Sequence, residues 1–559
     1  MQPKPDSNEP RLKDFMHFKE SLPTLLMLGL LSLSAVYVFF WGQGAKVFWS
    51  GFIAILVFYG LTFFTGSYIA RRHSHTEEGA DAILGGRNIP LWVSVFTMAA
   101  TWLGGGYING SAEATYKSGL VWLQAPWGYA ISLILGGLFF AKIMRKFKYR
   151  TMLDPLEQRF GKKMTAILFL PALVGELFWT AAILSALGST FGIVIGLDFG
   201  VSVIISAAVA IGYTALGGLW AVALTDVIQL SLLFLGLGVI LPFIIDSSGG
   251  MANTWAAYSA KWGESASFLP STGALGSSYW VWWDYAFLLI FGGIPWHSYF
   301  QRVLAAKTDK AAVSFSIIAG FICLFAAIPP IIIGMVGGVT DWTSFGGAPE
   351  NSLNILPYVI KYLTPTAIAT IGLGAVATAV MSSVDSSILS ASSMSVWNIY
   401  RPLFDQNISR DRINHLVKVF VWVNGILATL IALQVQSIYT LWILCSDFVY
   451  CLLFPALVTA LFDTKANFYG ALAGFLVAFI LRFGGGEASL GLPTILPYPV
   501  LDAATELAKD GSRIAILFPF RTFAMLCGLI SIILVSRLTQ KSLPASELAI
   551  DDTHSFAQK

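Results

Sequence analysis

The chain has 559 residues, of which 56% are hydrophobic and 12% are charged, and its mean hydropathy is +0.72. Soluble domains are about one quarter charged, so this composition excludes a soluble globular protein and indicates an all-α protein embedded in the lipid bilayer. The net charge of +3 is small and the basic residues lie in loops, which argues against nucleic acid as a partner. The four cysteines lie in apolar segments without the spacing of a metal site.

Apolar runs long enough to cross a hydrocarbon core of about 30 Å recur along the whole chain. They predict about fourteen spans, at 23–42, 48–70, 92–115, 120–141, 164–190, 200–216, 219–244, 281–300, 311–337, 366–398, 415–434, 437–461, 466–482 and 520–537. The first run follows a polar leader and lacks an A-x-A cleavage pattern, so we interpret it as a span rather than a signal peptide.

Lysine and arginine concentrate in four loops, at 70–88, 142–163, 301–310 and 401–412. With fourteen spans these loops fall on the same side as both termini, whereas three loops poor in charge fall on the other side. The positive-inside rule therefore predicts a multi-pass protein of the cell membrane with both termini in the cytoplasm. The loops are too short for a soluble catalytic domain, so we expect the function to reside within the bilayer.

Two predicted spans contain residues that weaken a helix. The stretch TWLGGGYINGS at 101–111 places three glycines after Trp102, and LIFGGIPWHSYFQR at 289–302 places two glycines and a proline before Trp296. Unwound backbone is tolerated in a membrane only where it is buried or lines a cavity. Interrupted spans five helices apart indicate the inverted repeats of a transporter with a midplane site. Packing notches for neighbouring helices are the alternative.

The segment AVMSSVDSSILSASS at 379–393 places hydroxyl groups along one helical face. Hydroxyl and carboxylate oxygens are hard ligands that suit Na⁺, and an unwound helix can add free carbonyls. Membrane serines can instead bond to their own or a neighbouring helix. That alternative does not explain Asp385, because a carboxylate in a span costs a few kcal/mol and usually marks an ion or proton path. Asp226 and Asp447 are two further acids within spans.

Several of the 18 tryptophans do not fit the aromatic belts expected at the membrane interfaces. Trp102 and Trp296 adjoin the predicted helix breaks, Trp179 and Trp442 lie within spans, and Tyr129 can join them. If these rings face one cavity they form a cage for a cation, in which a desolvated cation–π contact contributes about 2 kcal/mol. For each ring taken singly, ordinary core packing is the alternative.

Seven motifs between about Gly51 and Leu538 resemble those of the sodium/solute symporter family, and of its choline-transporting members in particular. They are FTMAATWLGGGYINGSAEA, SLILGGLFFAKIMR, TMLDPLEQRFGKKM, PALVGELFW, GGIPWHSYFQRVL, LGAVATAVMSSVDSSILSASSM and LLFPALVTALF. The resemblance implies a leucine-transporter-type inverted repeat of five plus five helices with flanking helices, and Na⁺- and Cl⁻-dependent import of choline by alternating access. The chain then divides into a cytoplasmic tail (1–22), an extra span (23–47), the symporter domain (48–538) and a second cytoplasmic tail (539–559).

The resemblance also implies the residues of the site. The choline cage falls on Trp102, Tyr129, Trp179, Trp296 and Trp442. One sodium site falls on the carbonyls of Ala100, Leu103 and Ala379 and the hydroxyls of Ser382 and Ser383. A second falls on Ser383, Asp385 and Ser386, with Asp226 close by. A co-bound Cl⁻ would offset the repulsion among these cations, although nothing in the sequence locates it. His297 stands beside Trp296 where animal members have a glutamine, which leaves the substrate range open.

The sequence is also compatible with other functions. The same machinery could carry a betaine, proline or a sugar, and a channel or a receptor would share the composition. An enzyme is not expected, because the sequence has no recognisable nucleophile–base pair, metal cluster or phosphate-binding loop. The sequence leaves the oligomeric state open, including a homodimer.

Overall fold

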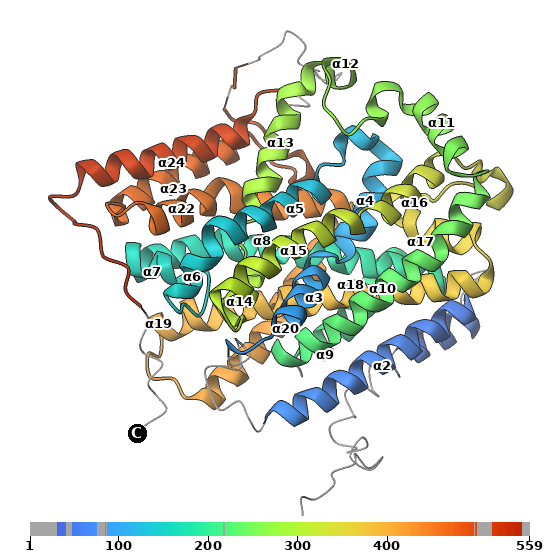
Figure 1. The fold of residues 1–559 in the computed structure, drawn as a ribbon, viewed down its shortest axis with the longest axis horizontal. Helices are drawn as coiled ribbons and strands as arrows, with labels where there is room; N and C mark the ends of the chain where they lie inside the picture. The colour runs from blue at the N-terminus through green and yellow to red at the C-terminus, as the bar shows by residue number, and fades with distance from the viewer. Residues whose placement is uncertain are drawn as a thin grey trace, which may run out of the picture.

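The computed structural model describes residues 29, 31–40, 47–74, 84, 87–215, 219–435, 437–496, 498–499 and 517–550. Within these ranges the regular structure is helical (Figure 1), apart from isolated β-bridges at Ile89–Ala306 and Glu487–Leu492. The prediction of an all-α protein is therefore confirmed.

Within the described residues, each predicted span coincides with helical structure. The main helices are α2 (Trp49–Ser74), α3 (Leu91–Trp102), α4 (Gly105–Ser118), α5 (Ala125–Leu135), α8 (Lys162–Ile195), α9 (Phe199–Thr214), α10 (Leu219–Ser247), α13 (Tyr279–Gly292), α14 (His297–Ala305), α15 (Asp309–Ala326), α16 (Ile328–Val339), α18 (Thr366–Met394), α20 (Arg410–Gln434), α21 (Ile438–Phe448), α22 (Phe454–Phe462), α23 (Phe468–Gly484) and α24 (Phe520–Leu538). Of the extra N-terminal span, the described part is a helix at Leu31–Phe40. In the described residues eight helices are long and apolar enough to cross a membrane, or nine if α3 and α4 form one bent span. The total of fourteen stays a prediction.

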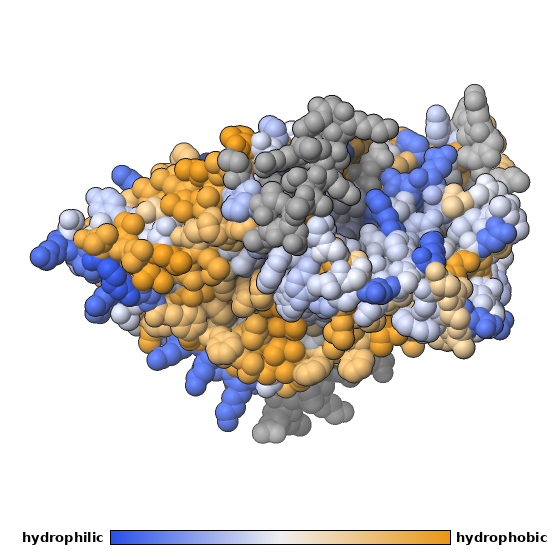
Figure 2. All heavy atoms as spheres, turned by 90° about the horizontal axis from the view of Figure 1, so that it is seen from above, coloured by the Kyte–Doolittle hydropathy of each residue, from blue (hydrophilic) through white to orange (hydrophobic). Residues whose placement is uncertain are grey.

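The helices divide into an inner and an outer set. In α8 and in α18, 78% of the most apolar 18-residue stretch is buried inside the bundle, whereas the buried share is only 28% in α20 and 33% in α24. The outer helices expose large apolar side chains, among them Leu235, Phe325, Leu430 and Leu534. Figure 2 shows hydrophobic residues gathered along the middle of one face, with hydrophilic residues toward the ends. This surface suits a bilayer.

The packing of helices in the first half of the bundle recurs in the second half. Helix α8 packs against α9 and α21, and α18 packs in the same way against α20 and α10. Helix α3 packs against α15, as α13 packs against α5. When each helix of one pair is replaced by the helix five spans before or after it, the corresponding pair results. This is the arrangement that two repeats of five helices produce, and it places α8 and α18 together at the centre.

The basic loops meet at one end of the bundle. The Arg87 side chain donates a hydrogen bond of 2.9 Å to the carbonyl of Lys148, and the backbone N–H of Lys307 donates to the carbonyl of Ile89. Further contacts join Asn398 to Asp154 and Ala549 to Gln158. The structure thus groups these loops with the described part of the C-terminal tail, as the sequence predicts. That this end is cytoplasmic stays a prediction.

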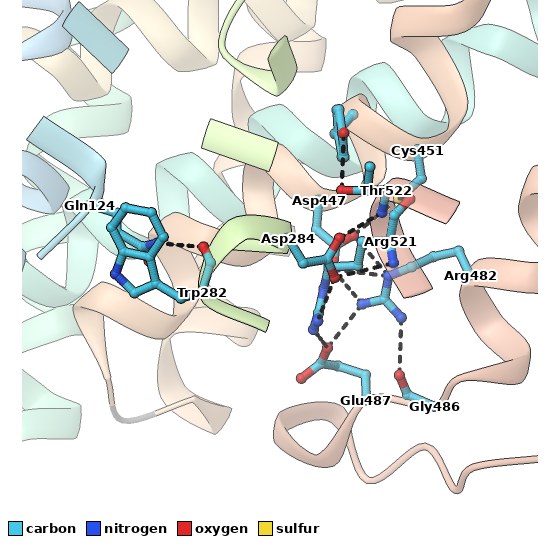
Figure 3. Close-up of polar contacts among 11 residues, drawn as sticks. Gln124, Trp282, Asp284, Asp447, Cys451, Arg482, Gly486, Glu487, Arg521 and Thr522 are labelled. Atoms are coloured by element: carbon cyan, nitrogen blue, oxygen red, sulfur yellow. Dashed lines mark hydrogen bonds and ion pairs between the residues drawn. The ribbon is translucent and has the colours of Figure 1, made fainter. Parts of the chain in front are cut away.

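A buried ion cluster fastens α24 to the rest of the bundle (Figure 3). Arg482 on α23 and Arg521 on α24 both donate to Asp447 on α21 and to Glu487. Asp284 on α13 accepts backbone N–H groups at the start of α24, where a negative charge also suits the helix dipole. Asp447 is therefore balanced by two guanidinium groups, which gives this intramembrane acid a structural role.

Helices α23 and α24 lie side by side on one flank of the bundle, and α2 lies on the opposite flank (Figure 1). Small residues recur every four positions on α23, at Gly470, Gly474 and Ala478, a pattern that lets two membrane helices approach closely. A Cβ atom built at Gly474 would lie 2.3 Å from Cγ1 of Ile532 and 2.6 Å from the carbonyl oxygen of Gly528. The close packing of this pair therefore requires glycine at position 474.

We expect Gly474→Leu to lower the melting temperature of the detergent-purified protein, because overpacking a tight contact costs roughly 1–3 kcal/mol. Scanning fluorimetry measures this shift. Gly238→Leu on α10 is the matched control, since a Cβ atom there meets nothing within 4 Å. Equal melting temperatures for the two variants would contradict this packing.

Candidate substrate and ion site

Both glycine-rich stretches interrupt their helices, as the sequence predicts. Helix α3 ends at Trp102 and α4 begins at Gly105 with a bend of 47° between them. Helix α13 ends at Gly292 and α14 begins at His297. Trp296 immediately before α14 is extended, with φ −110° and ψ 131°. The two breaks expose backbone groups inside the bundle, where side chains can reach them.

The three consecutive glycines of the first break also pack tightly. A Cβ atom at Gly104 would lie 2.1 Å from Oγ of Ser383, and one at Gly105 would lie 2.4 Å from Cβ of Ala186. One at Gly106 would lie 3.2 Å from Cγ of Trp442. These contacts come from α18, α8 and α21. Helix breaking and close packing are therefore not alternatives here, because the same glycines serve both.

The structure brings all five predicted cage residues together around one cavity. Each ring is at most 6% exposed, and each comes from a different part of the bundle: α3, α5, α8, the start of α14, and α21. The ring centroids of Trp179 and Trp296 are 5.3 Å apart, and those of Trp102 and Trp179 are 5.6 Å apart. The residues that line the cavity are Trp102, Tyr129, Trp179, Trp296, Trp442 and Cys445.

The cavity is small and its walls are held by hydrogen bonds. Its volume is about 10 Å³, about the space that one buried water molecule needs. The indole N–H of Trp296 donates a 2.7 Å bond to the carbonyl of Gly292, which the second break frees. The Tyr129 hydroxyl is bonded to Ser446. Among the described residues the buried indole N–H of Trp102 has no hydrogen-bond partner. It can therefore donate to a ligand.

The first break lies against the serine-rich face of α18. The hydroxyl of Ser383 donates to the carbonyls of Ala100, at 3.1 Å, and Thr101, at 3.0 Å. Leu103 lies at the break itself, and Ala379 lies one turn before Ser383 on α18. The predicted ligands of the first sodium site thus lie around one junction of α3 and α18. Ser382 departs from this grouping and donates to Asp226 on α10, at 2.5 Å.

The residues of the second predicted sodium site lie on two helices, with Asp226 on α10 and Ser383, Asp385 and Ser386 on α18, and they contact different neighbours. Asp226 accepts a 2.5 Å hydrogen bond from Thr97, in addition to the bond from Ser382. Ser386 contacts the hydroxyl of Thr101 at 3.2 Å. Asp385 faces α9, where its Oδ1 accepts a 2.7 Å bond from Thr214, while its Oδ2 has no partner among the described residues.

Two charged residues of the site, Glu176 and Arg302, were not singled out from the sequence. Both are 1% exposed. Arg302 on α14 donates a 2.6 Å bond to Ser386 and lies 3.8 Å from Asp226. Glu176 on α8 accepts a 2.5 Å bond from the hydroxyl of Ser390. A charge inside an apolar span is the signal that could have identified them.

His297 ties α14 to the loop that follows α6 (Lys142–Lys146). Its Nδ1 atom accepts a 3.3 Å hydrogen bond from the backbone N–H of Met152. His297, which leaves the substrate range open in the sequence, therefore also positions the helix that begins directly after Trp296.

Comparison with known proteins agrees with the family resemblance of the sequence motifs. The Sodium:solute symporter family matches residues 83–478 of the chain. The High-affinity choline transporter 1 of Drosophila melanogaster is 45% identical over 89% of this chain and 80% of that protein. The High affinity choline transporter 1 of Homo sapiens is 46% identical over 88% of this chain and 85% of that protein.

Among solved structures, the fold is similar to that of a Na⁺-coupled sialic acid symporter. The TM-score is 0.72 at 20% identity, over 89% of this chain and 98% of the other. At this identity the similarity concerns the fold alone. The relatives are named as transporters and the family is one of symporters, which confirms that the protein is not an enzyme. The chain belongs to the sodium:solute symporter family.

Proposed function

We propose that the protein imports choline across the cell membrane together with Na⁺ by alternating access. The observation that carries this proposal is the meeting of five aromatic rings around one cavity at two helix breaks. The relatives named as choline transporters support the same substrate.

The cavity matches the chemistry of choline. A quaternary ammonium group has no N–H to donate, so aromatic faces are its natural partners. Choline also carries one hydroxyl, which can accept a hydrogen bond from the unpartnered indole N–H of Trp102. A betaine or proline would bring a carboxylate instead, and no basic side chain lines the cavity formed by these described residues. The lining therefore favours choline over those alternatives.

Sodium would bind where α3 and α18 meet. In the proposal, the first site uses the carbonyls of Ala100, Leu103 and Ala379 and the hydroxyls of Ser382 and Ser383. The second site uses Ser383, Asp385 and Ser386, with Asp226 close by. Each positive charge that moves inward gains roughly 2.3 kcal/mol per 100 mV of membrane potential. A tenfold Na⁺ gradient adds about 1.4 kcal/mol per ion. Coupling to Na⁺ thus supplies the energy for uphill import.

The charges buried below the cage support this coupling. As ionised groups, Glu176, Asp226 and Asp385 bring three negative charges to this region, and among the described residues Arg302, which pairs with Asp226, brings one positive charge. Two formal negative charges remain, which is the number that choline and one Na⁺ neutralise. A second Na⁺ would exceed this balance, and a co-bound Cl⁻ would then offset the excess. Chloride dependence is part of the proposal for this reason.

The function is tested by uptake of labelled choline into proteoliposomes, with Na⁺ and Cl⁻ removed in turn. We expect saturable, uphill uptake that stops without Na⁺ and weakens without Cl⁻. A channel would give only downhill flux, and a receptor none. Uptake that is indifferent to Na⁺ would contradict the proposal.

We expect Trp102→Ala and Trp296→Ala to raise the choline KM roughly tenfold or more, because a desolvated cation–π contact is worth about 2 kcal/mol. The measurement is concentration-dependent choline uptake at saturating Na⁺. Trp280→Ala is the control, since this ring is 47% exposed on the outside of α13. Unchanged KM values in both cage variants would contradict the proposal that these rings bind choline.

Asp385→Asn should weaken activation by Na⁺ more than it weakens choline binding at saturating Na⁺, because it removes a charge proposed to attract the ion. Na⁺ dose–response curves for choline uptake measure this difference. Asp246→Asn, the same change at an exposed residue near the end of α10, is the matched control. An unaltered dose response in Asp385→Asn would count against its role in Na⁺ binding.

A further inference from the structure

The guanidinium of Arg302 occupies part of the region where we propose that Na⁺ binds. Its Nη2 atom donates a 2.6 Å hydrogen bond to Oγ of Ser386 and lies 3.8 Å from Oδ2 of Asp226. Both residues belong to the proposed second Na⁺ site. An arginine stays protonated in proteins, so a Na⁺ ion at these oxygens would face a like charge within a few ångströms.

A second acceptor for this guanidinium lies nearby on α8. Oε1 of Glu176 accepts hydrogen bonds from Ser390 and Ser298, whereas its Oε2 is buried and has no partner among the described residues. The Nη1 atom of Arg302 donates a 3.1 Å bond to the carbonyl of the same Ser298. The Nε–H of Arg302 is buried without a partner as well. Ser298 therefore contacts both Glu176, whose Oε2 is an unused acceptor, and Arg302, whose Nε–H is an unused donor.

We propose that Arg302 is an internal cation that Na⁺ displaces. Without Na⁺ at the second site, the guanidinium neutralises Asp226 and holds Ser386. When Na⁺ binds to these two residues, the guanidinium moves to Oε2 of Glu176. This inference deepens the proposed function and rests on it, because it concerns the same Na⁺ site. Arg302 is a positioning residue here and does not itself contact the substrate.

The movement would reach the cage through two short connections. Arg302 belongs to α14, which begins directly after Trp296, and Glu176 lies one turn before Trp179 on α8. The rings of Trp179 and Trp296 are in contact, with centroids 5.3 Å apart. A guanidinium that passes from Asp226 to Glu176 exchanges a tie between α14 and α10 for a tie between α14 and α8. Na⁺ binding would thereby fix two walls of the cage relative to each other.

The test is a titration of purified protein with ²²Na⁺ in the absence of choline. Glu176→Gln should raise the Na⁺ concentration of half-saturation, because the displaced guanidinium loses its second partner. Arg302→Gln should lower it about fivefold or more, as expected for the removal of a competitor. In the double variant the value should equal that of Arg302→Gln alone, because the Glu176 effect acts only through Arg302.

Glu113→Gln is the matched control. Glu113 is also a buried carboxylate, but it accepts backbone N–H groups at the start of α21 and does not contact Arg302 in the described structure. We expect no shift in half-saturation for this variant. If Arg302→Gln does not fold, Arg302→Lys takes its place as the background, in which the Glu176→Gln shift should shrink.

Two results would overturn the role of Arg302: a higher half-saturation in Arg302→Gln, or an equal shift from Glu176→Gln in both backgrounds. Either would mean that Arg302 does not compete with Na⁺ through Glu176. Choline uptake by the wild-type protein, measured in parallel, tests the proposed function separately. Na⁺-driven uptake together with additive shifts would refute this inference and leave the proposed function standing.

Discussion

Every backbone N–H and C=O group inside a membrane needs a hydrogen-bond partner from the protein, and this requirement decides where the bundle can bind a ligand. The first break lies between the buried helices α8 and α18, and the second packs against α5 and α21. There the freed carbonyls of Ala100 and Thr101 are met by Ser383, and that of Gly292 is met by the ring of Trp296. Such side-chain partners can be exchanged for an ion or can move with the break, which a continuous helix does not allow.

Two clusters of buried acids differ in how their charge is balanced. In the outer cluster, Arg482 and Arg521 pair with three carboxylates, so each carboxylate has a guanidinium partner and the cluster acts as a fastening for α24. In the inner cluster, among the described residues, Asp226 pairs with Arg302, whereas Asp385 and Glu176 accept hydrogen bonds from the hydroxyls of Thr214 and Ser390. An excess of negative charge in a buried site favours the entry of cations, because the charges otherwise lack compensation. The balance of charge, more than the presence of an acid, distinguishes the proposed ion site from a structural one.

The helices and their breaks were predictable from the sequence, whereas the contacts between side chains on different helices were not. Hydropathy and the Gly/Pro interruptions predicted the helical segments and both breaks, because these depend on short stretches of sequence. The resemblance of the sequence motifs to the family predicted that the five rings converge. Ser382 and Ser383 show the limit: adjacent helical positions point about 100° apart, and one hydroxyl reaches Asp226 while the other reaches Ala100. The pairing of Arg302 with residues on other helices likewise depends on tertiary packing.

In the proposed function, the tightness of the cage would link substrate entry to the breaks. A cavity of about 10 Å³, whose tryptophan rings meet edge to face, has no room for a ligand unless the rings separate. Trp102 is the last residue of α3 and Trp296 is the residue before α14, so these two rings belong to the hinges themselves. A change in either helix angle therefore moves a wall of the cage, and a ligand that parts the rings must turn a hinge. Opening of the proposed cage and movement of the broken helices would then be one event, which is the mechanical condition for the alternating access that we propose.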